Sequence, residues 1–119
     1  MANHENPMFR RGVLPLMVLG LLKQEDMYGY QMVQAIYRFS DEKMLVKEGS
    51  LYPVLYRLEE EGLISFHKEQ TGKRMVRTYY HLEHAGEQRL QELIQEYNDT
   101  TRLIFRIVDN EGGNSNDNP

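Results

Sequence analysis

Residues 47–82 read KEGSLYPVLYRLEEEGLISFHKEQTGKRMVRTYYHL, and this stretch decides the fold. Its first part predicts a helix, because Leu51, Leu55 and Leu58 recur at the spacing that places side chains on one helical face. Gly49-Ser50 is the expected start, since a serine hydroxyl can accept a hydrogen bond from a free N–H group of the first turn. The apolar stripe should face a core and leave the other side of the helix to a partner.

The outward side of this helix is rich in side chains that suit contact with a partner. Its end is expected at Gly62, because glycine commonly terminates helices. Its proline lies early enough in the helix for the missing N–H group to cost little. On or near the outward side lie Ser50, Tyr52, Pro53, Tyr56 and Arg57.

The second part of the stretch predicts a β-hairpin. Residues 76–82 alternate with the two-residue period of a strand that buries one side, and residues 64–68 are the expected partner strand. Residues 69–74 are too polar to continue either strand, so they are the expected turn, with Gly72-Lys73-Arg74 at its tip. Cations at a hairpin tip suit phosphates or a minor groove. A helix followed by such a hairpin indicates a winged helix that binds DNA.

Two helices are expected before this stretch. Residues 13–22 are nearly all apolar and predict one buried helix, with Pro15 in its first turn. A second helix should open at Tyr28-Gly29-Tyr30, with Asp26 as its N-cap, and end near Ser40-Asp41. Its shared apolar face should consist of Met32, Val33, Ile36 and Phe39.

The order of elements predicts a helix-turn-helix. Residues 44–46 are a candidate short strand between the second and third helices. Three helices, the last followed by a hairpin, make the third the recognition helix. The expected class is α+β, mainly helical with a small β-hairpin, and the expected DNA-binding domain spans residues 9–82.

Residues 87–108 carry a long amphipathic pattern. One three-helix core can cover only part of it, so the rest is expected to pack on a second copy of the chain. A two-fold dimer would set two recognition helices about 34 Å apart, one turn of DNA. Residues 83–109 are therefore the expected dimerisation helix, and residues 110–119 a disordered tail by composition. The expected dimer contacts are Leu90, Leu93, Ile94, Tyr97, Ile104, Phe105 and Val108.

Length and composition narrow the classes of protein. A chain of 119 residues supports one small domain, for which help from a partner subunit is plausible. No apolar run approaches the roughly 20 residues that span a bilayer, and the first residues, MANHENPMFRR, lack the apolar core of a secretion signal. A cytoplasmic protein without a membrane partner is expected. The absence of cysteine excludes disulfides and thiolate metal sites.

Net charge is the main objection to DNA binding, because 14 basic and 18 acidic residues give −4. The distribution weakens this objection. Residues 43–77 hold seven basic and five acidic side chains, whereas most of the negative charge follows residue 78. A phosphate backbone responds to local charge, since the Debye length is about 8 Å at physiological salt.

Enzyme chemistry has no support in the sequence. There is no cysteine nucleophile, no Gly-x-Ser-x-Gly elbow and no phosphate-binding glycine loop. His81 and His84 lie three apart, but no third ligand is close in sequence, so a structural or solvated role is expected rather than a metal. Neither a cofactor nor a metal is expected.

Several motifs together resemble PadR-type transcriptional regulators. They are Tyr28-Gly29-Tyr30, then GSLYPVL at residues 49–55, RLEEEGLI at residues 57–64, YYHL at residues 79–82, and Ala85-Gly86. The resemblance covers roughly residues 10–108, and the length is similar to the short subfamily with a single C-terminal dimerisation helix. It implies a homodimeric winged helix-turn-helix repressor that binds a palindromic operator and is often released by a small molecule.

Two departures from the family pattern concern local geometry. The family wing usually reads Gly-Arg-Pro-Arg-Lys, whereas residues 72–78 are GKRMVRT, so the cations remain but the proline-fixed shape does not. The usual Leu-Thr before the last helix is Leu82-Glu83, which lacks a capping hydroxyl. In relatives that bind planar drugs, the ligand lies between the C-terminal helices and the first helix. The resemblance therefore implies an aromatic effector site at Val18, Ile94 and Tyr97.

Two functions from different classes remain. The first is a sequence-specific repressor; the second is a winged-helix module that binds another protein through its tyrosine-rich helix. Arg57 could equally pair with Glu60 or Glu61 on its own helix, and the tyrosines could be packed aromatics. The candidate DNA contacts are Tyr28, Ser50, Leu51, Tyr52, Pro53, Tyr56, Arg57, Lys73, Arg74 and Arg77.

Overall fold

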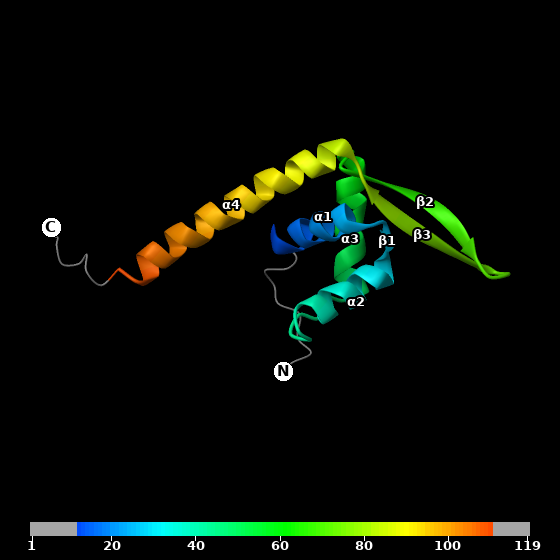
Figure 1. Ribbon diagram of the computed structural model, residues 1–119, viewed down its shortest axis with the longest axis horizontal. Helices are drawn as coiled ribbons and strands as arrows, with labels where there is room; N and C mark the ends of the chain where they lie inside the picture. Colours follow the sequence, from blue (N-terminus) through cyan, green and yellow to red (C-terminus); the bar gives the residue numbers. More distant parts are fainter. Residues whose placement is uncertain (1–11, 111–119) are drawn as a thin grey trace.

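The computed structural model describes residues 12–110, in which three helices form a body and two arms extend from it (Figure 1). The hairpin extends to one side of the body and the last helix to the other. This is the α+β winged-helix architecture expected from the sequence. The elements are α1 (Leu14–Gln24), β1 (Met27–Tyr28), α2 (Gly29–Phe39), α3 (Glu48–Glu60), β2 (Ile64–Thr71), β3 (Met75–Leu82) and α4 (His84–Val108).

One apolar core joins the helices of the body. Helices α1, α2 and α3 each contribute buried apolar side chains, and β1, β2 and the start of α4 close the core. No polar or charged side chain among the described residues is buried in it. The largest fully buried side chains are Leu14, Val18, Leu19, Met32, Val46, Leu51, Leu55 and Ile64.

The first two helices begin as local chemistry allows. Pro15 lies in the first turn of α1, where a missing N–H group costs nothing. Tyr28, not Asp26, is the N-cap of α2, and its N–H group donates to Gln31 Oε1 at 3.3 Å. The expectation for Asp26 is wrong because its carboxylate instead meets His81 Nδ1 at 2.8 Å, across 55 residues of sequence.

Helix α3 begins earlier than the sequence indicated. Lys47 is its N-cap and Ser50 lies one turn inside, so Ser50 is not the cap. Its end follows expectation: Gly62 adopts a φ of +74°, its N–H group donates to the Glu59 carbonyl, and the Leu63 N–H group donates to the Leu58 carbonyl. These two bonds satisfy carbonyls that the helix leaves unpaired, and only glycine adopts that φ at little cost.

The sheet has three antiparallel strands in the order β1-β3-β2. The hairpin register runs from Ile64 opposite Leu82 to Thr71 opposite Met75, so both strands are longer than expected and the turn is shorter. The short strand is Met27–Tyr28, paired with Tyr80 and Tyr79. The strand expected at residues 44–46 does not form, because that segment connects α2 to α3 and buries Val46 in the core.

The α2–α3 turn contains a second difference from the sequence-based expectation. Phe39 does not share the buried face of α2; it is 61% exposed, with the Arg38 guanidinium 5.3 Å from its ring centre. After it, Asp41 and Glu42 both adopt positive φ. Ser40 holds this turn by accepting a hydrogen bond from the Met44 N–H group.

Helix α4 contacts the body only near its start. Glu83 is its N-cap and makes no side-chain cap bond. Gly86 is buried against the Leu63 carbonyl and the Leu82 side chain, where any Cβ would collide. Leu90 is buried as well, and beyond Leu93 the helix leaves the body (Figure 1). No helix in the described part of the chain is long and apolar enough to cross a membrane. Of the expected tail, only Asn110 lies within the described residues.

Candidate nucleic-acid interface

The outward face of α3 is aromatic. Tyr52, Pro53 and Tyr56 are exposed, and Tyr56 is the most open at 71%. The same helix buries Leu55 and Leu58 on its other side, so its orientation against the body is fixed. Because the buried face cannot rotate outward without loss of the core, the aromatic face is held in one direction.

Tyr52 is fixed by contact with the next helix. Its ring and hydroxyl lie on the backbone of Gly29, the first residue of α2, so closely that a Cβ at Gly29 would collide with them. Burial raises the pKa of the Tyr52 hydroxyl, and the Glu48 carboxylate raises it further. The hydroxyl therefore stays protonated at physiological pH and can donate a hydrogen bond.

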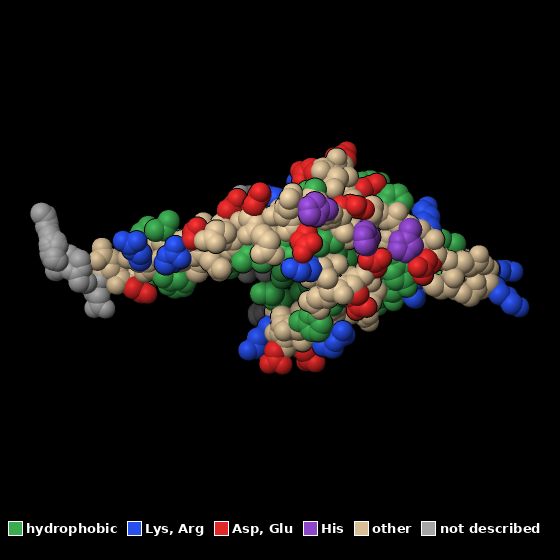
Figure 2. Space-filling model, turned by 45° about the horizontal axis from the view of Figure 1, so that its top comes forward, with side chains coloured by type: hydrophobic (Ala, Val, Ile, Leu, Met, Phe, Trp, Pro, Cys, Tyr) green, Lys and Arg blue, Asp and Glu red, His purple; other side chains and the backbone are tan. Residues whose placement is uncertain are grey.

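The wing presents its cations at the end of the hairpin. Lys73 and Arg74 are exposed and have no ion-pair partner among the described residues, and Figure 2 shows basic side chains at this tip. Gly72 turns the chain with a φ of +86°. Gln70 Nε2 donates to the Gly72 carbonyl at 3.2 Å and to the Lys73 carbonyl at 3.0 Å, which closes the turn.

Tyr28 and Arg77 form one cluster at the β1–β3 edge of the sheet, and both also line a hollow beside Tyr52 of α3. The Arg77 guanidinium lies 4.3 Å from the centre of the Tyr28 ring, a cation–π contact. The Tyr28 ring meets the Tyr79 ring edge-on at 5.4 Å, and Tyr79 stacks on His67. Both candidate residues are half-buried, so this cluster supports the base of the wing.

The structure corrects one candidate DNA contact, Leu51, and places another, Arg57, on a different flank of α3 from the tyrosines. Leu51 is fully buried in the core, so its side chain cannot reach a partner. Arg57 lies on the flank of α3 that faces α4, in a cavity with Glu61 and Arg89, and not beside the tyrosines. No ion pair of Arg57 with its helix neighbours forms within the described residues. Ser50 is half-buried near the start of α3.

The expected dimer contacts divide into two groups. Leu90 is buried in the body's own core, and Leu93 packs partly against it, so neither is an unpartnered contact. The remaining five side chains are exposed along α4, as are Leu103 and Ile107, which that set omitted. The exposed members of the expected set are Ile94, Tyr97, Ile104, Phe105 and Val108.

A cavity of about 740 Å³ lies between α4 and the start of α1. Tyr97 lines it, together with Leu16, Leu93 and Phe105. Val18 does not, because it is fully buried in the core, and Ile94 is not part of the wall either. Of the three residues proposed for an effector, the structure therefore places only Tyr97 at a cavity.

Sequence reasoning missed the space between α3 and the hairpin. Two hollows share Tyr52, Thr78 and Tyr80 in their walls, and Lys68 lines one of them. A signal was available: Lys68 and Thr78 alternate in step with Phe66 and Tyr80, which places all four on one face of the hairpin. The strand register needed to align them could not be read from the sequence.

Known proteins with a similar sequence or structure include transcriptional regulators of one family. A model of the PadR-like family of transcriptional regulators matches residues 18–92, more than half of the chain. The chain belongs to this family. Its relatives include Uncharacterized protein X of Lysinibacillus sphaericus, which is 31% identical over 94 residues, 79% of this chain and 86% of that protein.

Solved structures of PadR-like and other transcriptional regulators share the fold. A transcriptional regulator from Clostridium thermocellum, Cth-833, has a TM-score of 0.79 and 30% identity over 87% of this chain and 99% of the other. Bacillus subtilis PadR in complex with operator DNA has a TM-score of 0.64 and 28% identity over 69% of this chain. The match spans 47% of that PadR chain.

Proposed function

We propose that this PadR-like regulator binds operator DNA as a homodimer and represses transcription. One observation carries the proposal: α3 buries its leucines and holds Tyr52 and Tyr56 outward beside a hairpin that ends in Lys73 and Arg74. In a winged helix-turn-helix, the recognition helix enters the major groove and a cationic wing suits the backbone or the minor groove. The operator complex of Bacillus subtilis PadR supports the same use of this fold.

Dimerisation follows from the exposed stripe of α4. A monomer in water would leave Ile104, Phe105 and Val108 between 49% and 67% exposed on a free helical arm. Apolar patches of this kind usually mark interfaces, and a second copy of the same stripe is the simplest partner that closes on itself. The name of the Bacillus relative, "Negative transcriptional regulator PadR", supports repression. Such a regulator would act in the cytoplasm, where a bacterial chromosome lies.

The proposal includes a small aromatic molecule that relieves repression. The cavity beside Tyr97 is large enough for a planar ligand, and its walls come from both α1 and α4. A ligand there would touch the arm and the body at once, so it could change the distance between two reading heads. Isothermal titration with planar compounds tests this step, and equal binding by Tyr97→Ala would remove Tyr97 from the site.

The decisive experiment measures binding to the DNA upstream of the protein's own coding region. We expect fluorescence anisotropy to give an affinity that falls steeply with salt, because released counterions drive the contact. Tyr52→Ala and Ser50→Ala should weaken this duplex more than a scrambled duplex. No binding at micromolar dimer and low salt would contradict the proposal and favour a winged-helix module that binds another protein.

A further inference from the structure

A cleft runs between α3 and the inner face of the hairpin. Its volume is about 240 Å³. A separate hollow of about 360 Å³, lined also by Tyr28 and Arg77, shares Tyr52 and Tyr80 with it. Phe66 pairs with Tyr80 and Lys68 with Thr78, so these side chains share the strand face that lines the cleft. The cleft is therefore walled by one helix and two strands of fixed register.

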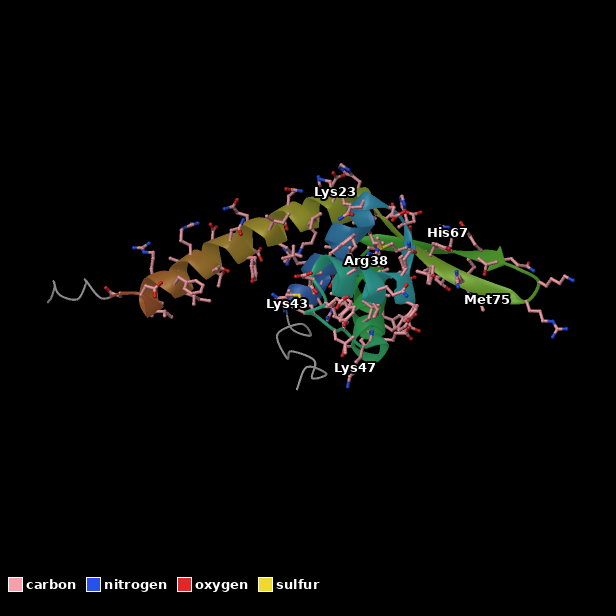
Figure 3. All side chains as sticks on the ribbon, turned by 60° about the horizontal axis from the view of Figure 1, so that its bottom comes forward. Lys23, Arg38, Lys43, Lys47, His67 and Met75 are labelled. Carbon is pink, nitrogen blue, oxygen red and sulfur yellow. The ribbon has the colours of Figure 1, made fainter. Side chains whose placement is uncertain are left out.

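The position of this cleft has a geometrical consequence. The major and minor grooves of a duplex are separated by a single sugar-phosphate strand. If α3 enters the major groove and the tip of the hairpin reaches the neighbouring minor groove, that strand must cross the space between α3 and the hairpin. Figure 3 shows the hairpin, with Met75 labelled near its tip, leading away from α3 to one side, while Lys47 marks the N-terminal end of α3.

We propose that this cleft holds one phosphodiester strand of the operator, contacted by Lys68, Thr78 and Tyr80. The inference rests on the proposed DNA-binding function and adds three contacts beyond the outward face of α3 and the tip of the wing. It assigns a role to strand residues between the two regions that sequence patterns identified.

The walls of the cleft suit a phosphate chemically. Thr78 and Tyr80 can donate hydrogen bonds through their hydroxyls, and Lys68 supplies a positive charge. Burial raises the pKa of the Tyr80 hydroxyl, and the neighbouring Tyr52 and Glu59 raise it further, so the group remains a donor. Phe66 is 45% exposed at the edge and offers an apolar surface to a deoxyribose.

One side chain opposes the proposed ligand. Glu59 lies in the same cleft, and its carboxylate would repel a phosphate. This gives the proposal a test of opposite sign: removal of the Glu59 charge should tighten DNA binding, whereas removal of the Lys68 charge should weaken it. A purely structural role for the cleft would not make affinity follow the sign of these charges.

The experiment uses the full chain and the upstream duplex that the wild-type protein binds. Anisotropy is measured across a salt series for Lys68→Gln, Tyr80→Phe, Thr78→Val and Glu59→Gln. Tyr79→Phe is the matched hydroxyl control, because the neighbouring ring lies on the opposite face of the strand. Lys23→Gln is the charge control, since Lys23 lies on α1 and pairs with Glu87. Thermal melting confirms that each variant is folded.

We expect Lys68→Gln to reduce the slope of log affinity against log salt by about 1, the signature of one lost phosphate contact. Tyr80→Phe should weaken binding about three- to tenfold, the effect of one hydrogen bond. Glu59→Gln should bind more tightly than wild type, and both controls should match wild type. Wild-type affinity and slope in folded Lys68→Gln and Tyr80→Phe would overturn the inference while the proposed function stands.

A second measurement locates the contacted strand. Neutral methylphosphonates replace the phosphates of the duplex one at a time. One substitution should weaken the wild type but not Lys68→Gln, and it should lie between the groove read by α3 and the groove reached by the wing. If no position shows this dependence on Lys68, the strand does not pass through the cleft. Failure of the wild type to bind any duplex would instead defeat the proposed function itself.

Discussion

Asp41 and Glu42 hold backbone angles that residues other than glycine seldom adopt, with φ of 61° and 65°. They end α2 as glycine usually does, because the Asp41 N–H group donates to the Arg38 carbonyl and the Glu42 N–H group to the Tyr37 carbonyl. Aspartate tolerates this conformation better than glutamate does. The turn between α2 and α3 is therefore strained, most of all at Glu42.

Relief of that strain should stabilise the protein. Glu42→Gly removes a left-handed cost of about 1–2 kcal/mol and adds roughly 0.5–1 kcal/mol of unfolded-state entropy, so we expect a gain of up to about 1 kcal/mol. Urea unfolding measures it. The matched control is Lys43→Gly, at a position without positive φ, which should lose stability. A loss in Glu42→Gly as large as in the control would show that the turn is not strained.

His81 links the wing to the α1–β1 loop through Asp26. The hydrogen bond that His81 Nδ1 donates to the Asp26 carboxylate raises the pKa of the His81 imidazole, with further support from the Asp26 and Glu83 charges. A raised folded-state pKa stabilises the protein fully below the unfolded value near 6.5, and the contribution is lost as pH rises through the folded pKa. Both side chains are about half exposed, at 52% and 41%, so solvent limits the effect to at most about 1 kcal/mol.

The pH dependence can be measured directly. We expect the difference in unfolding free energy between wild type and Asp26→Asn to be largest near pH 5.5 and to shrink toward pH 8.5. Urea unfolding at several pH values measures it, and His84→Gln, which lies outside the pair, serves as the control. A difference that grows with pH would contradict the assignment.

At the scale of elements, one face of α3 stabilises the fold and the opposite face carries the side chains that we propose to bind DNA. Leu55 faces the core and Tyr56 faces outward, although they are neighbours in sequence. Leu55→Ala should cost about 2–5 kcal/mol of stability because it opens a cavity. Tyr56→Ala should change stability by less than about 0.5 kcal/mol, as expected for an exposed site, and should weaken DNA binding. Denaturant melts and anisotropy on both variants test this division, and equal stability losses would contradict it.

Elements with a clear period were predictable from the sequence, and contacts between distant residues were not. The leucine spacing of residues 51–58 indicated α3 and its buried face, and Gly62 indicated its end. The two-residue strand β1 has no period, so it was missed and a strand was expected at residues 44–46 instead. Asp26 looked like a cap because its partner His81 is distant in sequence.

The candidate site was predictable to a similar degree. Tyr52 and Tyr56 lie outside the leucine stripe in the sequence, so their outward positions on the helix could be expected. Leu51 belongs to the leucine stripe, so the sequence itself indicated that its side chain is buried and does not contact DNA. The flank occupied by Arg57 depends on where α4 packs, and the exposure of Phe39 depends on where α2 ends. Both are tertiary facts that a single helical pattern does not contain.

At the scale of the whole molecule, the proposed dimer depends on the free arm. Ile104→Glu places a charge in the middle of the exposed stripe of α4, where it would be buried between two copies. We expect a monomer, or a dimer weakened at least a hundredfold, in sedimentation experiments, with operator binding lost in parallel. Gln95→Glu is the matched control, because nine residues place Gln95 half a turn away from Ile104 on the same helix. An unchanged dimer in Ile104→Glu would show that α4 pairs through another face.

Gly86 anchors the start of α4 against the Leu63 carbonyl, and the end of the helix at Val108 is about 33 Å away, since each residue rises about 1.5 Å. In the proposed dimer, this distance sets how far apart the two copies hold their recognition helices. An arm longer or shorter by two turns would keep the same stripe facing inward and would fit operators with different gaps between their halves. A family built on this plan can thus change its target genes through arm length alone, with every base-contacting side chain left as it is.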